Sequence, residues 1–376
     1  IIANNNPING DTIYFDEKIN QMSSGASVTI NSKNVFLPKA LKNSGAYLRW
    51  KEIENVYFEG TQQQWYAVNF NSIDYFPVSV DTKLFIQGEL LPENVLIDVP
   101  TAGNHILSNI EHIKIIEFGD KNTRISSNTL RNVYANTIIL GKNLEYIIRN
   151  TNDSSIFASC FNLREVYYNN DLCSWYMVSN GAYFGNLDYF YMYENGNWVN
   201  VLDKEEIIIK NITTTQMSGT FYGWKNLSSV KFEEGVLVDR LYQTFSSCEK
   251  LTSIILPSNL KEISQSTFAG CVLLKEIEIP EQVEKIGSLV FNGCSSLESI
   301  ILPKSIKTLE MDMLHNSAIK IVTLKSINPP TIYSTTFTSS VLEEIRVPAE
   351  SVETYKTATN WTRYASLIVA DPEEEV

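Results

Sequence analysis

The sequence predicts an α/β repeat solenoid built from coils of about 23 residues, each burying its apolar side chains against its neighbours. Two observations support this fold class. The frame F-x-x-C-x-x-L-x-x-I-x-[LI]-P occurs three times at one constant period, beginning at Phe245, Phe268 and Phe291. A shorter apolar pair, I-x-L, recurs along most of the chain and predicts one short strand per coil. A single compact core has no reason to keep one register through three successive copies.

The strand pairs define the expected solenoid from one end to the other. The pairs are Val35/Leu37, Val56/Phe58, Ile97/Val99, Ile116/Phe118, Ile138/Leu140, Val166/Tyr168, Ile207/Ile209, Val230/Phe232, Ile254/Leu256, Ile277/Ile279, Ile300/Leu302, Val322/Leu324 and Ile345/Val347. From Ile207 onward every step stays close to the period of the frame, which predicts regular coils. Earlier in the chain, two steps are nearly twice as long, from Val56 to Ile97 and from Val166 to Ile207.

These two long steps predict a duplicated, enlarged coil, at about 56–97 and 166–207. Trp65 follows Val56 at the same spacing as Trp175 follows Val166, so the two copies share one internal pattern. The additional residues are rich in aromatic side chains, Asn and Gly. We expect each insertion to form a short hairpin or a Trp-anchored helical turn that projects from the solenoid.

The domain boundaries follow from the repeats. Residues 1–34 form an N-terminal segment or cap, 35–348 the solenoid, 349–370 a C-terminal cap, and 371–376 a solvated acidic tail. Ser351 to Thr359 predicts a short helix with Ser351 as its N-cap. Trp361 and Tyr364 are bulky enough to close the last coil, and repeat arrays require such a cap.

Composition and motifs exclude several classes of function. The net charge of −13 argues against nucleic acid, and there is no apolar run long enough to span a membrane. Cys248, Cys271 and Cys294 recur once per coil and predict a column of buried, reduced thiols. The three histidines fit no ligand spacing and are expected on the surface. No catalytic, metal-binding or phosphate-binding motif is present, so we expect no catalysis, no metal and no cofactor.

The repeated frame resembles the BspA-like leucine-rich repeat of bacterial surface proteins. Gly60-Thr61-Gln-Gln-Gln-Trp65 resembles a G-T-x-x-x-W coil of that family, although Asn170-Asp171 replaces Gly-Thr in the second copy. The ending Val347-Pro-Ala-Glu-Ser-Val-Glu-Thr-Tyr355 is similar to the family's last coil. The resemblance implies a right-handed leucine-rich-repeat superhelix with its short strands on a concave face. It also implies secretion or display on a bacterial cell surface, and adhesion-type binding without catalysis.

Two sets of residues are candidates for binding. In each I-x-L pair the middle residue points away from the core, and half of these residues are apolar or aromatic. The apolar and aromatic members are Tyr57, Ile139, Tyr167, Ile208, Ile255 and Ile301. The alternative is that these residues serve only strand propensity. The second set is Tyr75, Phe76, Tyr183 and Phe184, at the tips of the insertions. The alternative there is that each Trp only pins its insertion to the solenoid.

Three functions remain open at this point. The first is a secreted or cell-surface protein that binds a protein or glycan ligand, such as a component of a host surface or matrix. The second is a spacer that displays another domain. The third and weakest is a carbohydrate-active enzyme with carboxylates assembled across coils.

Overall fold

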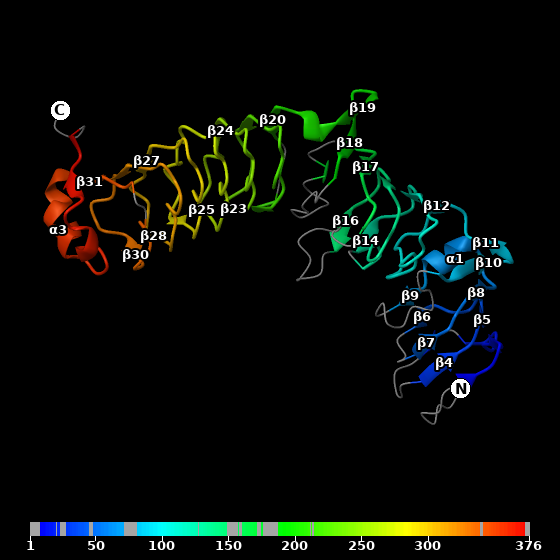
Figure 1. Cartoon of the computed structure of the whole chain (residues 1–376). Helices are drawn as coiled ribbons and strands as arrows, with labels where there is room; N and C mark the ends of the chain where they lie inside the picture. The colour runs from blue at the N-terminus through cyan, green and yellow to red at the C-terminus, as the bar shows by residue number, and fades with distance from the viewer. Residues whose placement is uncertain are drawn as a thin grey trace. The chain divides into compact units, whose positions relative to one another are not determined.

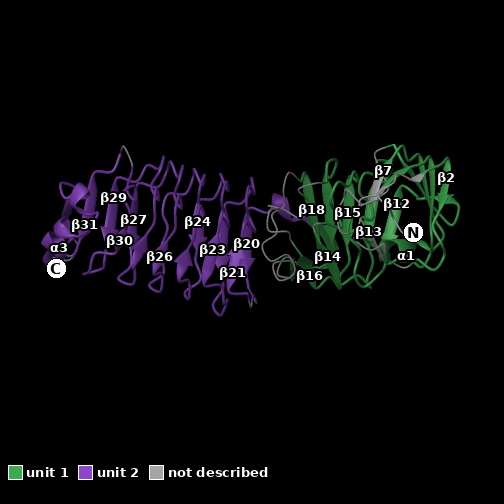
Figure 2. Cartoon of the chain, turned by 90° about the horizontal axis from the view of Figure 1, so that it is seen from below, with its two compact units in different colours: residues 1–179, 184–199 green, residues 180–183, 200–376 purple. Residues whose placement is uncertain are grey.

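The computed structural model describes most of the chain and divides it into two compact units. The described residues are 8–19, 21–22, 28–44, 48–70, 81–126, 128–148, 157, 160–170, 174–175, 187–210, 212, 214–338 and 341–372. Unit 1 comprises residues 1–179 and 184–199, and unit 2 comprises 180–183 and 200–376 (Figure 2). Each unit is a solenoid of short parallel strands, so the predicted fold class is confirmed. Its helical part is small.

The first coils of unit 1 carry three strands each, and the strands of successive coils pair in parallel (Figure 1). The strands are β1 (Ile8–Asn9), β2 (Thr12–Tyr14), β3 (Gln21–Met22), β4 (Val28–Asn31), β5 (Asn34–Leu37), β6 (Asn43–Ser44), β7 (Leu48–Lys51), β8 (Asn55–Phe58) and β9 (Asn69–Phe70). They lie in three sheets: β1-β4-β7, β3-β6-β9, and β2-β5-β8, the last of which is part of a five-stranded sheet. Because β2 pairs with β5, the ladder extends into residues 1–34, ahead of the boundary expected at residue 35.

The rest of unit 1 completes the sheet of β2, β5 and β8 with two further strands and adds one long sheet and one short sheet. The strands are β10 (Lys83–Ile86), β11 (Glu89–Leu90), β12 (Asn94–Ile97), β13 (Ile115–Phe118), β14 (Arg124–Ser126), β15 (Thr137–Leu140), β16 (Tyr146–Ile148), β17 (Glu165–Tyr168), β18 (Tyr189–Glu194) and β19 (Asn197–Asn200). The sheet β12-β13-β15-β17-β18-β19 contains the predicted I-x-L strands, and β14 pairs with β16. Alternate residues of each predicted strand are buried, as in β13 and β15.

Both enlarged coils contain the expected hairpin. The first contains the expected helical turn, and Ser174 and Trp175 of the second are helical as well. Helix α1 (Gln62–Tyr66) begins with a capping box, in which the Thr61 hydroxyl accepts from the Gln64 N–H and the Gln64 side chain accepts from the Thr61 N–H. Gly60 is required before it, because a Cβ there would lie 2.5 Å from the Phe58 ring. Trp65 is fully buried and its indole N–H donates to the Ile106 carbonyl at 2.9 Å.

The hairpins contain strands that sequence analysis missed. Strand β10 pairs in parallel with β8 and returns through β11, and β18 pairs in parallel with β17 and neighbours β19. The turns Gln87-Gly88 and Asn195-Gly196 have φ of 54° and 84°, and of 51° and 86°. Two consecutive positive φ values match the twist of a tight hairpin. Each enlarged coil therefore adds one more strand to the ladder instead of only projecting from it.

The register of one expected strand is wrong by two residues. The pair Ile97/Val99 was expected to face inward, with Asp98 outward. In the structure β12 ends at Ile97, Val95 lies opposite Ile116, and Leu96 points outward. The cause is an alternation that continues through Val95, Ile97 and Val99, all of which are buried.

Unit 2 has two parallel ladders, one on each side of its coils (Figure 1). We call the I-x-L strand of any coil its front strand, and in unit 2 the second strand its back strand. The front strands are β20 (Glu206–Ile209), β22 (Ser229–Phe232), β24 (Ser253–Ile255), β27 (Ser299–Leu302), β29 (Ile321–Leu324), β31 (Glu344–Val347) and β32 (Ile368–Ala370). The back strands are β21 (Gln216–Ser218), β23 (Arg240–Tyr242), β25 (Glu262–Ile263), β26 (Lys285–Ile286), β28 (Thr308–Leu309) and β30 (Thr331–Ile332).

The core of unit 2 explains the F-x-x-C frame. Phe221, Phe245, Phe268 and Phe291 are fully buried and stack with ring centroids 5.2, 5.7 and 6.0 Å apart. The thiols of Cys248, Cys271 and Cys294 are buried and free, and each donates to the carbonyl of the Phe in the preceding coil at 3.0–3.2 Å. The expected column of buried thiols is therefore confirmed for these three residues. Cys173 lies outside the described residues.

The C-terminal end closes the array with a helical cap that packs on the last coils. It consists of η3 (Ala349–Ser351), α3 (Val352–Thr357), η4 (Thr362–Tyr364) and strand β32. Trp361 is buried against Tyr355 and Phe337, and its indole N–H donates to the Pro330 carbonyl at 2.9 Å. The Ser351 side chain makes no cap hydrogen bond, contrary to expectation.

The expected acidic tail also starts too early. Asp371 is only 3 % exposed and forms an ion pair with Lys325 at 2.6 Å. Its N–H donates to the Val347 carbonyl, so Asp371 belongs to the last coil and not to a solvated tail.

Candidate functional site

The front strands present one outward residue per coil, and these residues form the candidate surface. In most of these strands the two I-x-L side chains are buried and the residue between them is exposed or half-buried, as strand geometry favours, whereas Thr323 in β29 is buried. Of the predicted residues, Ile208, Ile255 and Ile301 are 56, 57 and 53 % exposed. The other predicted residues, Tyr57, Ile139 and Tyr167, are half-buried. The predicted tip residues Tyr75, Phe76, Tyr183 and Phe184 lie outside the described residues.

Tyr57 is part of a four-ring stack that the sequence analysis did not recognise. Tyr14, Phe36, Tyr57 and Phe85 are the outward residues of β2, β5, β8 and β10. Their ring centroids are 4.5, 4.4 and 4.9 Å apart, with interplanar angles of 19°, 9° and 16°. In this N-terminal aromatic ladder the rings cover one another's faces, so a partner would meet mainly ring edges. Only Tyr14, at 68 % exposure, is open to a large extent.

Tyr167 belongs to a second aromatic group, built by the other enlarged coil. We define the Trp198 cluster as Tyr167, Tyr189, Tyr191, Tyr193 and Trp198. Tyr167 stacks on Tyr191 at 4.6 Å, while Trp198 packs edge-on against both Tyr167 and Tyr193 at 5.3 Å. The side chains of Tyr189, Tyr193 and Trp198 are 42–44 % exposed. The hairpin β18–β19 thus brings Trp198 back over the outward face of β17.

The polar surroundings of this cluster are acidic. The Tyr167 hydroxyl donates to the Glu165 carboxylate at 3.3 Å. Partial burial and the Glu165 charge raise the pKa of Tyr167, because both disfavour the phenolate. Tyr167 therefore keeps its hydroxyl proton at neutral pH.

Sequence reasoning could have found Phe85 and Tyr191. Lys83-Leu-Phe-Ile86 and Phe190-Tyr-Met192 alternate as other front strands do, with Leu84, Ile86, Phe190 and Met192 buried. They were assigned to projecting insertions because their steps depart from the regular period. Trp198 carries no such signal, because its position depends on the return strand of the hairpin.

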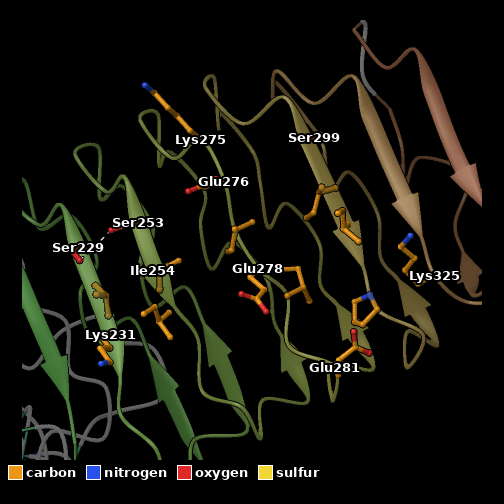
Figure 3. Close-up of a pocket in the computed structure, with 17 residues that line it drawn as sticks. Ser229, Lys231, Ser253, Ile254, Lys275, Glu276, Glu278, Glu281, Ser299 and Lys325 are labelled. Atoms are coloured by element: carbon orange, nitrogen blue, oxygen red, sulfur yellow. Dashed lines mark hydrogen bonds between the residues drawn. The ribbon is translucent and has the colours of Figure 1, made fainter. Parts of the chain in front are cut away.

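In unit 2 the outward residues Ile255, Glu278 and Ile301 line a hollow of about 750 Å³ (Figure 3).

The charged side chains of the back strands, in contrast, form ion pairs with one another. Glu262 contacts Arg240 at 3.0 Å and Lys285 at 3.7 Å, and Lys285 contacts Glu310 at 2.7 Å. The hydrogen bond that Lys285 donates to the Glu310 carboxylate is the main cause that raises the pKa of Lys285.

Other candidate chemistry is absent from the part of the chain that the structure describes. No group of three or more His, Cys, Asp or Glu side chains is placed there to bind a metal ion. His105 is buried, not on the surface as expected, with its Nδ1 3.4 Å from the Ser108 hydroxyl. Among the described residues, no helix combines the length and apolar character that a membrane span needs.

Several solved structures are similar to this chain. A leucine rich cell surface protein from Faecalibacterium prausnitzii A2-165 is 18 % identical, with 84 % of this chain and 88 % of that chain covered and a TM-score of 0.45. A leucine-rich repeat protein from Bacteroides ovatus ATCC 8483 is 14 % identical over 96 % and 92 %, with a TM-score of 0.46. The pneumococcal vaccine antigen PcpA is 14 % identical over 97 % and 90 %, with a TM-score of 0.45.

No curated protein sequence matches the chain. The sequence does match the family described as the BspA type leucine rich repeat region, in six copies over residues 89–184, 198–319 and 262–362. This match covers more than half of the chain and coincides with the coils seen in the structure. The chain therefore belongs to the BspA type leucine rich repeat family.

Proposed function

We propose that this chain is a binding protein of a bacterial cell surface, which holds a partner against its front strands and catalyses no reaction. Membership of the BspA type family supports this proposal, since leucine-rich-repeat solenoids serve as extended binding surfaces. The single observation that carries it is the exposed Trp198 cluster. Strand packing alone does not require five aromatic side chains to gather on a solvent-facing surface.

A protein partner suits the Trp198 cluster better than a glycan does. Stacking on a sugar needs an open ring face, but Tyr167 and Tyr191 cover each other and Trp198 is packed edge-on against its neighbours. Protein interfaces, in contrast, use Tyr and Trp as anchors through ring edges, hydroxyls and large contact area. A glycan ligand is the second candidate, and the open face of Tyr14 is the place where it would stack.

Unit 2 carries a separate candidate surface. There the exposed Ile208, Ile255 and Ile301 would provide apolar contacts of their own. The tips with Tyr75, Phe76, Tyr183 and Phe184 remain part of the proposal, because they belong to the same two enlarged coils.

The test is a binding screen with the intact chain against immobilised host matrix proteins and a glycan array. For a captured ligand, Trp198→Ala with Tyr193→Ala is expected to weaken binding about 100-fold, as the loss of two anchor residues at an interface does. Tyr146→Ala is the matched control, because Tyr146 is equally exposed but lies on β16. Equal weakening by the control would contradict the site. A chain that captures nothing would favour the alternative of a spacer that displays another domain.

A further inference from the structure

The front ladder of unit 2 is interrupted at one coil. Its strands form two sheets, β20-β22-β24 and β27-β29-β31-β32, and residues 275–279 join neither. Within the described residues, no backbone–backbone hydrogen bond involves an N–H or C=O of 275–279. On the back of the same coils, β25, β26 and β28 pair without a break. The coils therefore separate on the front side alone, and the backbone groups of 275–279 stay available.

The hollow of about 750 Å³ lies at this interruption. Its floor is apolar, with Ile254 and Ile300 buried, and its two walls are the exposed Ile255 and Ile301. Glu278 is the outward residue of the middle coil, between these walls. Figure 3 shows its carboxylate near the middle of the hollow. The order along the row is thus apolar, anionic, apolar.

The charge of Glu278 is not paired within the hollow. The structure gives Glu278 no ion pair among the described residues, unlike the paired glutamates of the back strands. Lys325 is neutralised by Asp371, and Figure 3 shows Lys275 pointing away from the hollow. Lys231, the outward residue of β22, lines one end of the hollow, two coils away from Glu278. The centre of the hollow therefore offers a carboxylate and free backbone carbonyl groups to a cation.

We propose that this hollow binds a lysine or arginine side chain on an extended segment of a partner protein. The aliphatic part of such a side chain would pack against Ile255 and Ile301, while its charged end would donate to Glu278 and to the free carbonyls of 275–279. In an extended segment, residues two before and two after the cation share its face. Apolar side chains at those two positions would meet the isoleucine walls. This site lies in unit 2 and does not depend on the Trp198 cluster.

The experiment titrates the full chain with the peptide Ac-Val-Ser-Lys-Ser-Val-NH2 by calorimetry at low salt. We expect saturable binding with a Kd of about 1 mM, and binding about fivefold weaker when norleucine replaces the lysine. Glu278→Gln is expected to weaken the lysine peptide by the same factor. Glu234→Gln, a control that removes one exposed charge outside the hollow, should leave the Kd unchanged.

Three outcomes would overturn the proposal. They are no saturable binding up to about 10 mM, equal binding of the norleucine peptide, and equal weakening by Glu278→Gln and Glu234→Gln. Trp198→Ala with Tyr193→Ala should not change the Kd of the lysine peptide. The proposed site in the hollow and the proposed site at the Trp198 cluster are therefore tested independently of each other.

Discussion

The regular coils of unit 2 and the enlarged coils of unit 1 use aromatic residues in opposite ways. In unit 2 four successive coils each point one phenylalanine inward, and Phe221, Phe245, Phe268 and Phe291 form a fully buried stack. In unit 1 aromatic side chains also point outward, in the N-terminal ladder and in the Trp198 cluster. The inward stack is what holds successive coils together. The outward rings do not fill the space between successive coils, so they can contact a binding partner.

The largest effect on stability is expected when one ring is removed from the inward phenylalanine stack. Phe268→Ala should lower the free energy of unfolding by about 3–5 kcal/mol, because a fully buried ring leaves a cavity between two coils. Urea unfolding of the intact chain measures this change. Leu273→Ala, in the same coil but 44 % exposed, is the control and should change stability by about 0.5 kcal/mol or less. A melt that Phe268→Ala leaves unshifted would contradict the role of the stack.

Trp65 and Trp175 test whether the enlarged coils are anchored in the same way. Each indole is fully buried, Trp65 against Phe58 and Phe70, and Trp175 against Tyr168 and Phe190. Trp65→Ala should cost about 3 kcal/mol, measured by urea unfolding, and Trp175→Ala a similar amount. If either change is neutral, that Trp does not fix its enlarged coil to the solenoid.

The front strands could be predicted from the sequence more completely in unit 2 than in unit 1. From Ile207 onward the period and register of the front strands were predicted correctly at every coil except one, because one frame repeats and each coil packs against a similar neighbour. The exception is the predicted pair Ile277/Ile279, whose residues form no strand. The predicted register is wrong where two choices of inward residues fit the sequence equally well, as at Val95-Leu-Ile-Asp-Val99. There the pairing of β12 with β13 decides.

The candidate sites were less visible. The aromatic groups depend on β10 and β18, short strands inside stretches that were assigned to insertions. The hollow at Glu278 could not be predicted, because its coil carries the same frame as its neighbours. It arises from backbone hydrogen bonds that are missing at 275–279, and no residue type signals their loss.

The buried thiols give the inward column a dependence on pH. Burial raises the pKa of Cys248 and Cys294 to about 12, from an ordinary value of 9.0. Because the folded chain disfavours the thiolate, the protonated thiols contribute fully to the free energy of unfolding below about pH 9. As the pH rises from 9 toward 12, the unfolded chain ionises first and this contribution is lost. Urea unfolding between these two pH values should show the loss. Cys271→Ala should show a smaller loss over the same window, and an equal loss would exclude the thiols as its cause.

A smaller effect is expected at the start of α1. Thr61→Ala removes the side chain that accepts from the Gln64 N–H, and it should cost about 1 kcal/mol. Thr61→Ser keeps the hydroxyl and should recover most of the loss in urea unfolding. Equal stability of the two variants would mean that the capping box does not stabilise the enlarged coil.

The outward rings are expected to matter least for stability and most for binding, and one measurement tests this directly. Trp198→Ala and Trp65→Ala each remove one tryptophan side chain. The side chain of Trp198 is 42 % exposed, and that of Trp65 is fully buried. Both variants are unfolded in urea and both are titrated with the ligand captured by the wild-type chain. We expect Trp198→Ala to change the free energy of unfolding by less than about 1 kcal/mol and to weaken binding at least tenfold. A Trp198→Ala variant that unfolds as readily as Trp65→Ala, or binds as tightly as the wild type, would contradict the division between inward and outward aromatic residues.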